Sequence, residues 1–324
     1  MSPLPSSPAT TTICHINGDE DLYGIGVRTG IYAQWVATLL SRTLRVPEEI
    51  TASDDANLCF QLALTAVLLF VLTGRKEPFM PVEALIALPL CFGGFAAASA
   101  PFSLPTTAAA AAAAPCRQAT SLVRFLCSLH LFGILAGVSC WFWWYGIEHG
   151  HNVAGDQCPY YTFLFAKVKV SDSLIGFYRF LAVVGCVVFA GIEAVLLVMM
   201  VHVVSRCSRH ELATYLLNAQ MPIMPKPSST TTGATACLQA PWASRIMALL
   251  CLVIMAVMVM VVEFTISWNG VNGINDLKAA GQALPLAVGI AGVVRVLYRG
   301  LKSRVGVGSG HGGGLVDELD LALA

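Results

Sequence analysis

Long apolar stretches alternate with short polar segments along the whole chain. Seven such stretches run over residues 22–41, 57–73, 80–100, 121–147, 174–205, 243–267 and 280–300. A helix needs about 20 mostly apolar residues to cross the hydrocarbon core of a bilayer, and six of the stretches clearly meet that requirement. The apolar runs are continuous rather than alternating, which predicts helices instead of strands. We therefore expect an all-α fold, a polytopic transmembrane helix bundle with seven spans.

The first stretch, residues 22–41, is the weakest candidate because it contains Arg28 and Gln34. Such a segment could lie in the membrane interface instead of crossing it. Small and polar residues at helical spacing favour a span, since they let two helices approach closely inside a bilayer. Those residues are Gly26, Gly30, Gln34, Thr38 and Ser41.

The distribution of basic residues predicts which side of the membrane each loop occupies. With the N-terminus outside, 12 Lys and Arg residues fall on the cytoplasmic side and 5 on the outer side. Cytoplasmic loops carry the excess of positive charge in membrane proteins, so we expect the N-terminus outside and the C-terminus in the cytoplasm. Residues 1–21 would then form an extracytoplasmic tail, and residues 22–300 the transmembrane domain with cytoplasmic linkers 101–120 and 206–242. Residues 301–324 would form a flexible cytoplasmic tail.

Composition agrees with a chain whose main solvent is lipid. Hydrophobic residues make up 56% and charged residues 12% of the sequence, whereas soluble domains carry about 25% charged residues. The net charge is zero and no long basic run is present, which argues against a nucleic-acid partner. We expect an integral membrane protein with the bilayer as its partner. The sequence does not identify a protein partner or distinguish the plasma membrane from an endomembrane.

Ionisable residues inside the apolar stretches are the sharpest chemical signals. A charge at bilayer depth costs roughly 2.5–3.5 kcal/mol on insertion scales, so such residues face the bundle interior and find partners. By depth, Glu193, His130 and Arg295 are predicted to form a polar centre. Nearer the outer surface, a second cluster is predicted from Arg28, Glu83, Arg179 and Glu263. The alternative interpretation is a set of structural ion pairs that order the helices.

Two further hypotheses concern the outer side. Cys14 and Cys158 are the cysteines that fall clearly in extracytoplasmic segments, which suggests a disulfide, although two free thiols remain the alternative. Glu148, His149 and His151 have the residue types of a transition-metal site, but their spacing matches no strong motif. We therefore predict neither a metal nor a cofactor.

Function is only weakly constrained. The leading hypothesis is a membrane protein that binds or passes a small solute or ion through the polar centre around Glu193. The alternatives are a receptor-like or sensory seven-helix protein with cytoplasmic partners, and a structural membrane scaffold. No paired catalytic motif lies at span depth, which argues against an enzyme.

Two segments resemble a known group of proteins. The first is Asp21-Leu22-Tyr23-Gly24-Ile25-Gly26-Val27-Arg28 with Tyr32 and Gln34-Trp35, and the second contains Trp268-Asn269, Gly281-Gln282, Pro285 and Arg295-Val296-Leu297. Both resemble uncharacterised multi-pass integral membrane proteins of filamentous fungi. The resemblance implies a polytopic helical fold and carries no activity with it.

The predicted orientation can be checked with tags on both termini. An N-terminal tag should be accessible in intact cells, and a C-terminal tag only after permeabilisation. Termini found on one side would reduce segment 22–41 to an interfacial helix and leave six spans.

Overall fold

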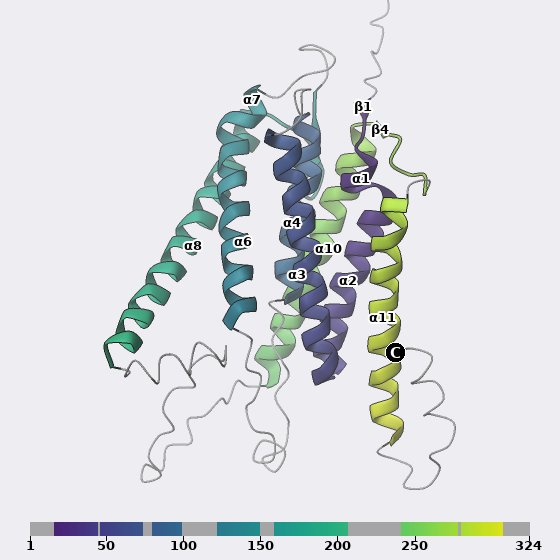
Figure 1. The fold of residues 1–324 in the computed structure, drawn as a ribbon. Coiled ribbons are helices and arrows are strands. Elements are labelled where there is room, and N and C mark those ends of the chain that lie inside the picture. The colour runs from purple at the N-terminus through teal and green to yellow at the C-terminus, as the bar shows by residue number, and fades with distance from the viewer. Residues whose placement is uncertain are drawn as a thin grey trace, which may run out of the picture.

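The computed structural model describes residues 16–44, 46–73, 80–98, 122–149, 159–206, 241–277 and 280–306. Figure 1 shows long helices side by side, with short strands gathered at one end of the bundle, which we name the strand end. The long helices are α2 (Ile25–Leu44), α3 (Pro47–Thr73), α4 (Pro81–Ala98), α6 (Leu122–Trp141), α8 (Asp172–Arg206), α10 (Pro241–Trp268) and α11 (Ala280–Gly306). The shorter elements are β1 (Ile16–Asn17), α1 (Glu20–Tyr23), the π-helix η1 (Phe142–Gly146), α7 (Ile147–His149), β2 (Tyr161–Phe163), β3 (Lys167–Lys169) and β4 (Val271–Asn272).

Six helical segments in the described residues are long and apolar enough to cross a membrane. They are Glu49–Thr73, Pro81–Ala98, Arg124–Gly146, Asp172–Val198, Arg245–Trp268 and Gly281–Lys302. This arrangement fits an all-α integral membrane protein. Helix α2 is not in that set, since Arg28, Gln34 and Arg42 lower its apolarity.

Despite its polarity, α2 lies inside the bundle. It packs against α3, α4, α10 and α11, and Figure 1 shows it between α10 and α11. Its Trp35 side chain is 1% exposed, and Thr38 and Ser41 are fully buried. The polar face of α2 therefore contacts protein instead of solvent or lipid.

Helices α2 and α11 run parallel and nearly touch through their backbones. A Cβ atom on Gly26 would collide with the backbone oxygen of Gln282, and one on Gly30 with that of Pro285. On α11, a Cβ on Gly289 would collide with the backbone oxygen of Gly30. The predicted small-residue stripe is thus the contact face, as expected where helices approach closely.

The third helix begins earlier than the apolar pattern predicts. We expected a span from residue 57, but α3 starts at Pro47. Proline suits the first helical position because its missing amide hydrogen would have no intrahelical partner there. Acidic residues such as Glu49 in the opening turns favour the helix dipole. The polar residues between 49 and 57 therefore extend the helix, and packing against α2 and α11 buries part of them.

Strand pairings tie distant segments together at the strand end. β1 pairs in parallel with β4, so residues before α2 join the connection between α10 and α11. The backbone N–H of Ile25 also donates to the carbonyl oxygen of Ile274 at 2.8 Å. Asp19 caps α1 by accepting from the N–H groups of Asp21 and Leu22, which satisfies donors that a helix start leaves unpaired. These bonds hold the start of α2 beside the start of α11.

The α2–α11 contact can be tested with Gly30→Val. The added side chain has no room against Pro285, so we expect the free energy of unfolding to fall by about 1–3 kcal/mol or more. Gly191→Val is the matched control, because nothing lies within 4 Å of a Cβ added at Gly191 on α8. Thermal unfolding in detergent measures both variants, and equal losses of stability would contradict this packing.

Candidate functional site

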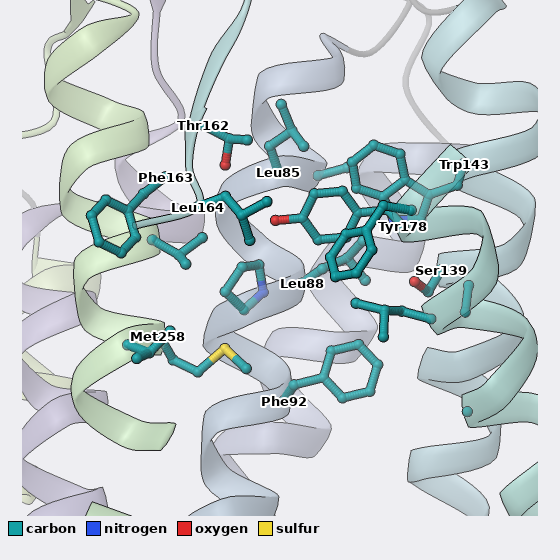
Figure 2. Close-up of a pocket in the computed structure, with 18 of the residues that line it drawn as sticks. Leu85, Leu88, Phe92, Ser139, Trp143, Thr162, Phe163, Leu164, Tyr178 and Met258 are labelled. Carbon is teal, nitrogen blue, oxygen red and sulfur yellow. The ribbon is translucent and has the colours of Figure 1, made fainter. Parts of the chain in front are cut away.

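A cavity in the described part of the chain lies between α4, α6, α8, α10 and the hairpin of β2 and β3. Its volume is about 420 Å³, within the range of about 300–1,000 Å³ typical of small-molecule sites. We name it the hairpin cavity. Figure 2 shows aromatic and aliphatic side chains converging on it; the lining includes Leu85, Leu88, Phe92, Phe132, Ala136, Trp143, Phe163, Phe177, Tyr178, Ala182 and Met258.

The hairpin is held in place by the end of α10. The N–H of Tyr161 donates to Oδ1 of Asn269 at 2.9 Å, and Nδ2 of Asn269 donates to the Tyr161 carbonyl oxygen at 2.7 Å. The Asn269 side chain thus bonds the strand as a neighbouring backbone would. Phe163 stacks on Phe264 with ring centroids 5.2 Å apart. The hairpin therefore forms a fixed wall of the cavity beside α10.

At its tip the hairpin turns through Phe165. This residue has a φ of 58°, in the left-handed region that favours glycine and costs a bulky residue about 1–3 kcal/mol. Its side chain is 81% exposed and also lines the cavity. The tip thus places a strained aromatic residue at the edge of the cavity.

The few polar groups in the cavity are uncharged. Tyr178 and Thr162 both line the cavity, and Oγ1 of Thr162 lies 3.2 Å from Oγ1 of Thr265. Ser139 adds one more hydroxyl to the lining. Pro89, also in the lining, has no amide hydrogen for the carbonyl oxygen four residues earlier. The cavity can therefore accept a mostly apolar molecule and offer it a few neutral hydrogen-bonding groups.

The π-helix η1 and the start of α8 close the cavity toward the strand end. Trp143 of η1 stacks on Tyr178 of α8, with centroids 4.4 Å apart and an interplanar angle of 2°. Nε of Arg179 donates to the Trp143 carbonyl oxygen at 2.8 Å, and its Nη2 donates to Glu148 at 2.7 Å. Single π-helical turns are frequent at functional sites.

The predicted polar centre is brought together only in part. Nε2 of His130 on α6 lies 3.8 Å from Oε1 of Glu193 on α8, with side chains 62% and 33% exposed. Arg295 does not join them, because its Nε pairs with Oε2 of Glu49 at 2.7 Å. Glu49 is 1% exposed and also pairs with Arg299 at 3.0 Å. Arg295 thus pairs with the buried carboxylate of Glu49 on α3, in a region that the apolar pattern had assigned to a loop.

The predicted outer cluster also divides. Arg28 pairs with Glu263 at 3.2 Å and donates to Asn275 at 3.2 Å, while the Tyr32 hydroxyl donates to Glu263 at 2.9 Å. Arg179 lies elsewhere, with Glu148.

Glu83, the fourth member of that predicted cluster, starts α4. Its side chain accepts from the N–H of Met80 at 3.3 Å, and its charge reaches the buried Tyr23 of α1. Burial, and then the Glu83 carboxylate, raise the pKa of Tyr23, against a lowering effect of Arg28. The Tyr23 hydroxyl therefore keeps its proton at neutral pH.

One polar feature was missed by the sequence analysis. The buried face of α3 carries polar residues at every fourth position, namely Glu49, Ser53, Asn57, Gln61 and Thr65. We name this row the α3 polar stripe. Gln34 of α2 donates to the Ser53 carbonyl oxygen at 2.9 Å, and Asn57 donates to that of Gly94 at 2.9 Å. The spacing of four was the available signal, since it places such residues on one helix face.

Some predicted residues lie outside the described part of the chain. Cys14, Cys158 and His151 are among them, and the side chain of His149 is not described. The disulfide between Cys14 and Cys158 therefore stays a prediction. Within the described residues, no group of three or more His, Cys, Asp or Glu side chains is arranged to hold a metal ion.

Two neighbouring ion pairs of α3 allow a matched test of burial. Nη2 of Arg42 donates to both carboxylate oxygens of Asp54 at 2.8 Å, and these side chains are 9% and 10% exposed. Asp54→Asn removes one of the two charges from this buried pair, so we expect a loss of about 3–5 kcal/mol in stability.

The adjacent Asp55 supplies the control. It pairs with Arg124 at 2.6 Å, but its own side chain is 55% exposed. Asp55→Asn should therefore cost about 0–1 kcal/mol. Thermal unfolding of both variants in detergent measures the difference, and similar losses would mean that the Arg42–Asp54 pair is solvated.

Comparisons of the chain with protein-family models, with curated proteins and with solved structures found no match. The resemblance to membrane proteins of filamentous fungi therefore stays a prediction. Function rests on the geometry of the described residues.

Proposed function

We propose that the protein is a seven-span membrane protein that binds an apolar, membrane-dissolved small molecule in the hairpin cavity. The observation that carries this proposal is the cavity itself, with a volume of about 420 Å³ and an almost wholly apolar lining. Ligand sites in general combine such a lining with a few placed polar groups. Here those groups are the hydroxyls of Ser139, Thr162 and Tyr178.

The seventh span in this proposal is α2. Its contacts with α11 run from Gly26 against Gln282 to Leu44 against Gly300, almost the full length of the candidate span Gly281–Lys302. A helix lying flat in the interface could not stay beside a crossing helix over that length. In a chain of seven consecutive spans, the first and last run in the same direction, which agrees with the parallel packing of α2 and α11.

The same proposal places the strand end outside the cell or in an organelle lumen. Arg42 lies near the C-terminal end of α2 and Arg124 near the N-terminal end of α6, and Arg295 and Arg299 lie in the C-terminal half of α11; these parts of the helices point away from the strand end (Figure 1). Excess positive charge on the cytoplasmic side supports that orientation. The hairpin cavity then lies in the half of the membrane nearer the outer surface, because Trp143, Thr162 and Phe163 all belong to strand-end elements.

The arrangement of α8 supports entry of the ligand from the bilayer. α8 packs against α6 and η1, and Figure 1 shows it leaning away from the other helices toward its C-terminal end. The side of the cavity between α8 and α10 would therefore face lipid. A molecule dissolved in the membrane could reach the cavity without crossing water.

The second candidate is the binding or passage of a small solute or ion through the polar interior. The specific observation in its favour is the α3 polar stripe, where Nε2 of the buried Gln61 has no hydrogen-bond partner among the described residues. The tight packing around this atom counts against it, because a Cβ on Gly94 would collide with Nε2 of Gln61. Solute flux into proteoliposomes that is lost in Gln61→Leu would favour this candidate.

A photoreactive fatty alcohol that carries a diazirine tests the leading proposal in lipid nanodiscs. We expect saturable labelling of peptides that line the hairpin cavity, displaced by the unlabelled alcohol. Ala136→Phe and Ala182→Phe fill the cavity and should weaken binding by about tenfold or more, equivalent to about 1.4 kcal/mol. Phe165→Gly suits the positive φ at the tip and should weaken binding without lowering stability.

The matched control is Ala190→Phe, since Ala190 lies on an exposed face of α8. Its labelling should equal that of the unmodified protein. Labelling that does not saturate, or that persists in both cavity-filling variants, would contradict the proposal. The alcohol would then contact the protein only as bulk lipid does, without binding in the cavity.

A further inference from the structure

Two cysteines from different helices face each other beside the hairpin cavity. Sγ of Cys140 on α6 lies 3.3 Å from Sγ of Cys186 on α8. Both are free thiols in the structure, and both are half-buried. A disulfide bond is about 2.05 Å long, so the sulfurs need to approach by roughly 1.3 Å, which small side-chain rotations can supply.

The two helices are already close next to this pair. A Cβ added to Gly185 would lie 3.8 Å from Cβ of Ala136, and Gly133 packs against the Phe189 ring. The antiparallel contact between α6 and α8 is therefore formed without the sulfurs. A covalent bond would fix an arrangement that exists instead of forcing a new one.

We propose that Cys140 and Cys186 form a reversible, redox-sensitive crosslink between α6 and α8, with an organic hydroperoxide as oxidant. One thiolate attacks the hydroperoxide and becomes a sulfenic acid, and the hydroperoxide leaves as an alcohol. The second thiol then attacks the sulfenic sulfur, forming the disulfide and releasing water. Two thiols and one hydroperoxide thus give one disulfide, one alcohol and one water. The apolar surroundings of the pair select an oxidant that dissolves in the membrane.

The crosslink would act on the α8 wall of the cavity, which packs against α6 and η1. Ser139 and Gly185, the sequence neighbours of the two cysteines, line the hairpin cavity. Because α8 leans away from the other helices toward its C-terminal end (Figure 1), a bond at Cys186 limits how far that wall can move from α6. The crosslink requires only the two thiols and forms whether or not a ligand occupies the cavity.

Peptide mapping of the full-length protein tests the proposal without a variant. The reduced protein in nanodiscs is treated with cumene hydroperoxide, its remaining thiols are alkylated, and the digest is analysed by mass spectrometry. We expect a crosslinked peptide pair that contains Cys140 and Cys186 and separates after reduction. Cys127 and Cys59, which are exposed, should still be free for alkylation at hydroperoxide concentrations that oxidise Cys140 and Cys186.

A stability measurement adds an independent readout. Oxidation should raise the melting temperature of the unmodified protein, since a crosslink restricts the unfolded chain. It should leave Cys186→Ser unchanged and raise the melting temperature of the matched control Cys127→Ser. Full alkylation of both Cys140 and Cys186 after oxidation, or their recovery in bonds to other cysteines, would overturn the proposal.

Discussion

Because Gly26, Gly30 and Gly289 have no side chains, the N-terminal halves of α2 and α11 approach each other backbone to backbone. Lipid tails are as apolar as the helix surfaces, so the hydrophobic effect does not drive helices together inside a bilayer. Close approach of this kind supplies van der Waals packing between the helices instead. It also brings a helix with two arginines and a glutamine into the interior of the bundle. The remaining helices must then provide partners for those groups, which sets much of their arrangement.

The partners come from different parts of the chain. Arg28 reaches Glu263 on α10, while Arg42 reaches Asp54 on α3. Ion pairs of this kind add little net stability, because the cost of removing two charges from water offsets their attraction. Their effect is on specificity, since a helix placed in another register would leave a charge unpaired at bilayer depth. The polar groups therefore determine which of the arrangements permitted by the apolar helix surfaces is formed.

The helices could be predicted from the sequence because a continuous apolar run is a local property. The small-residue stripe on α2 was visible for the same reason. The start of α3 was missed because six of its first ten residues are polar, and polar residues such as Glu49 and Ser53 become buried only through tertiary contacts of α3. Arg295 was predicted to lie beside Glu193 from its depth in the membrane alone. The face of α11 that carries Arg295 instead places its side chain beside Glu49. The hairpin cavity depends on contacts such as that between Asn269 and Tyr161, which are 108 residues apart, so no local pattern could indicate it.

The described residues divide the bundle into two regions with different physical character. Around α2, α3 and α11, backbones nearly touch and buried side chains are linked by hydrogen bonds and ion pairs. Around α6, α8 and the hairpin, the contacts are mainly aromatic and a cavity remains between them. Interiors that are closely packed resist deformation, whereas regions with fewer buried contacts open at lower free energy. Helix α4 packs against both regions and contributes Leu85, Leu88 and Phe92 to the cavity. The polar region thus supports one wall of the cavity through α4, and under the proposed function α8, on the opposite wall, would move to admit a molecule from the membrane.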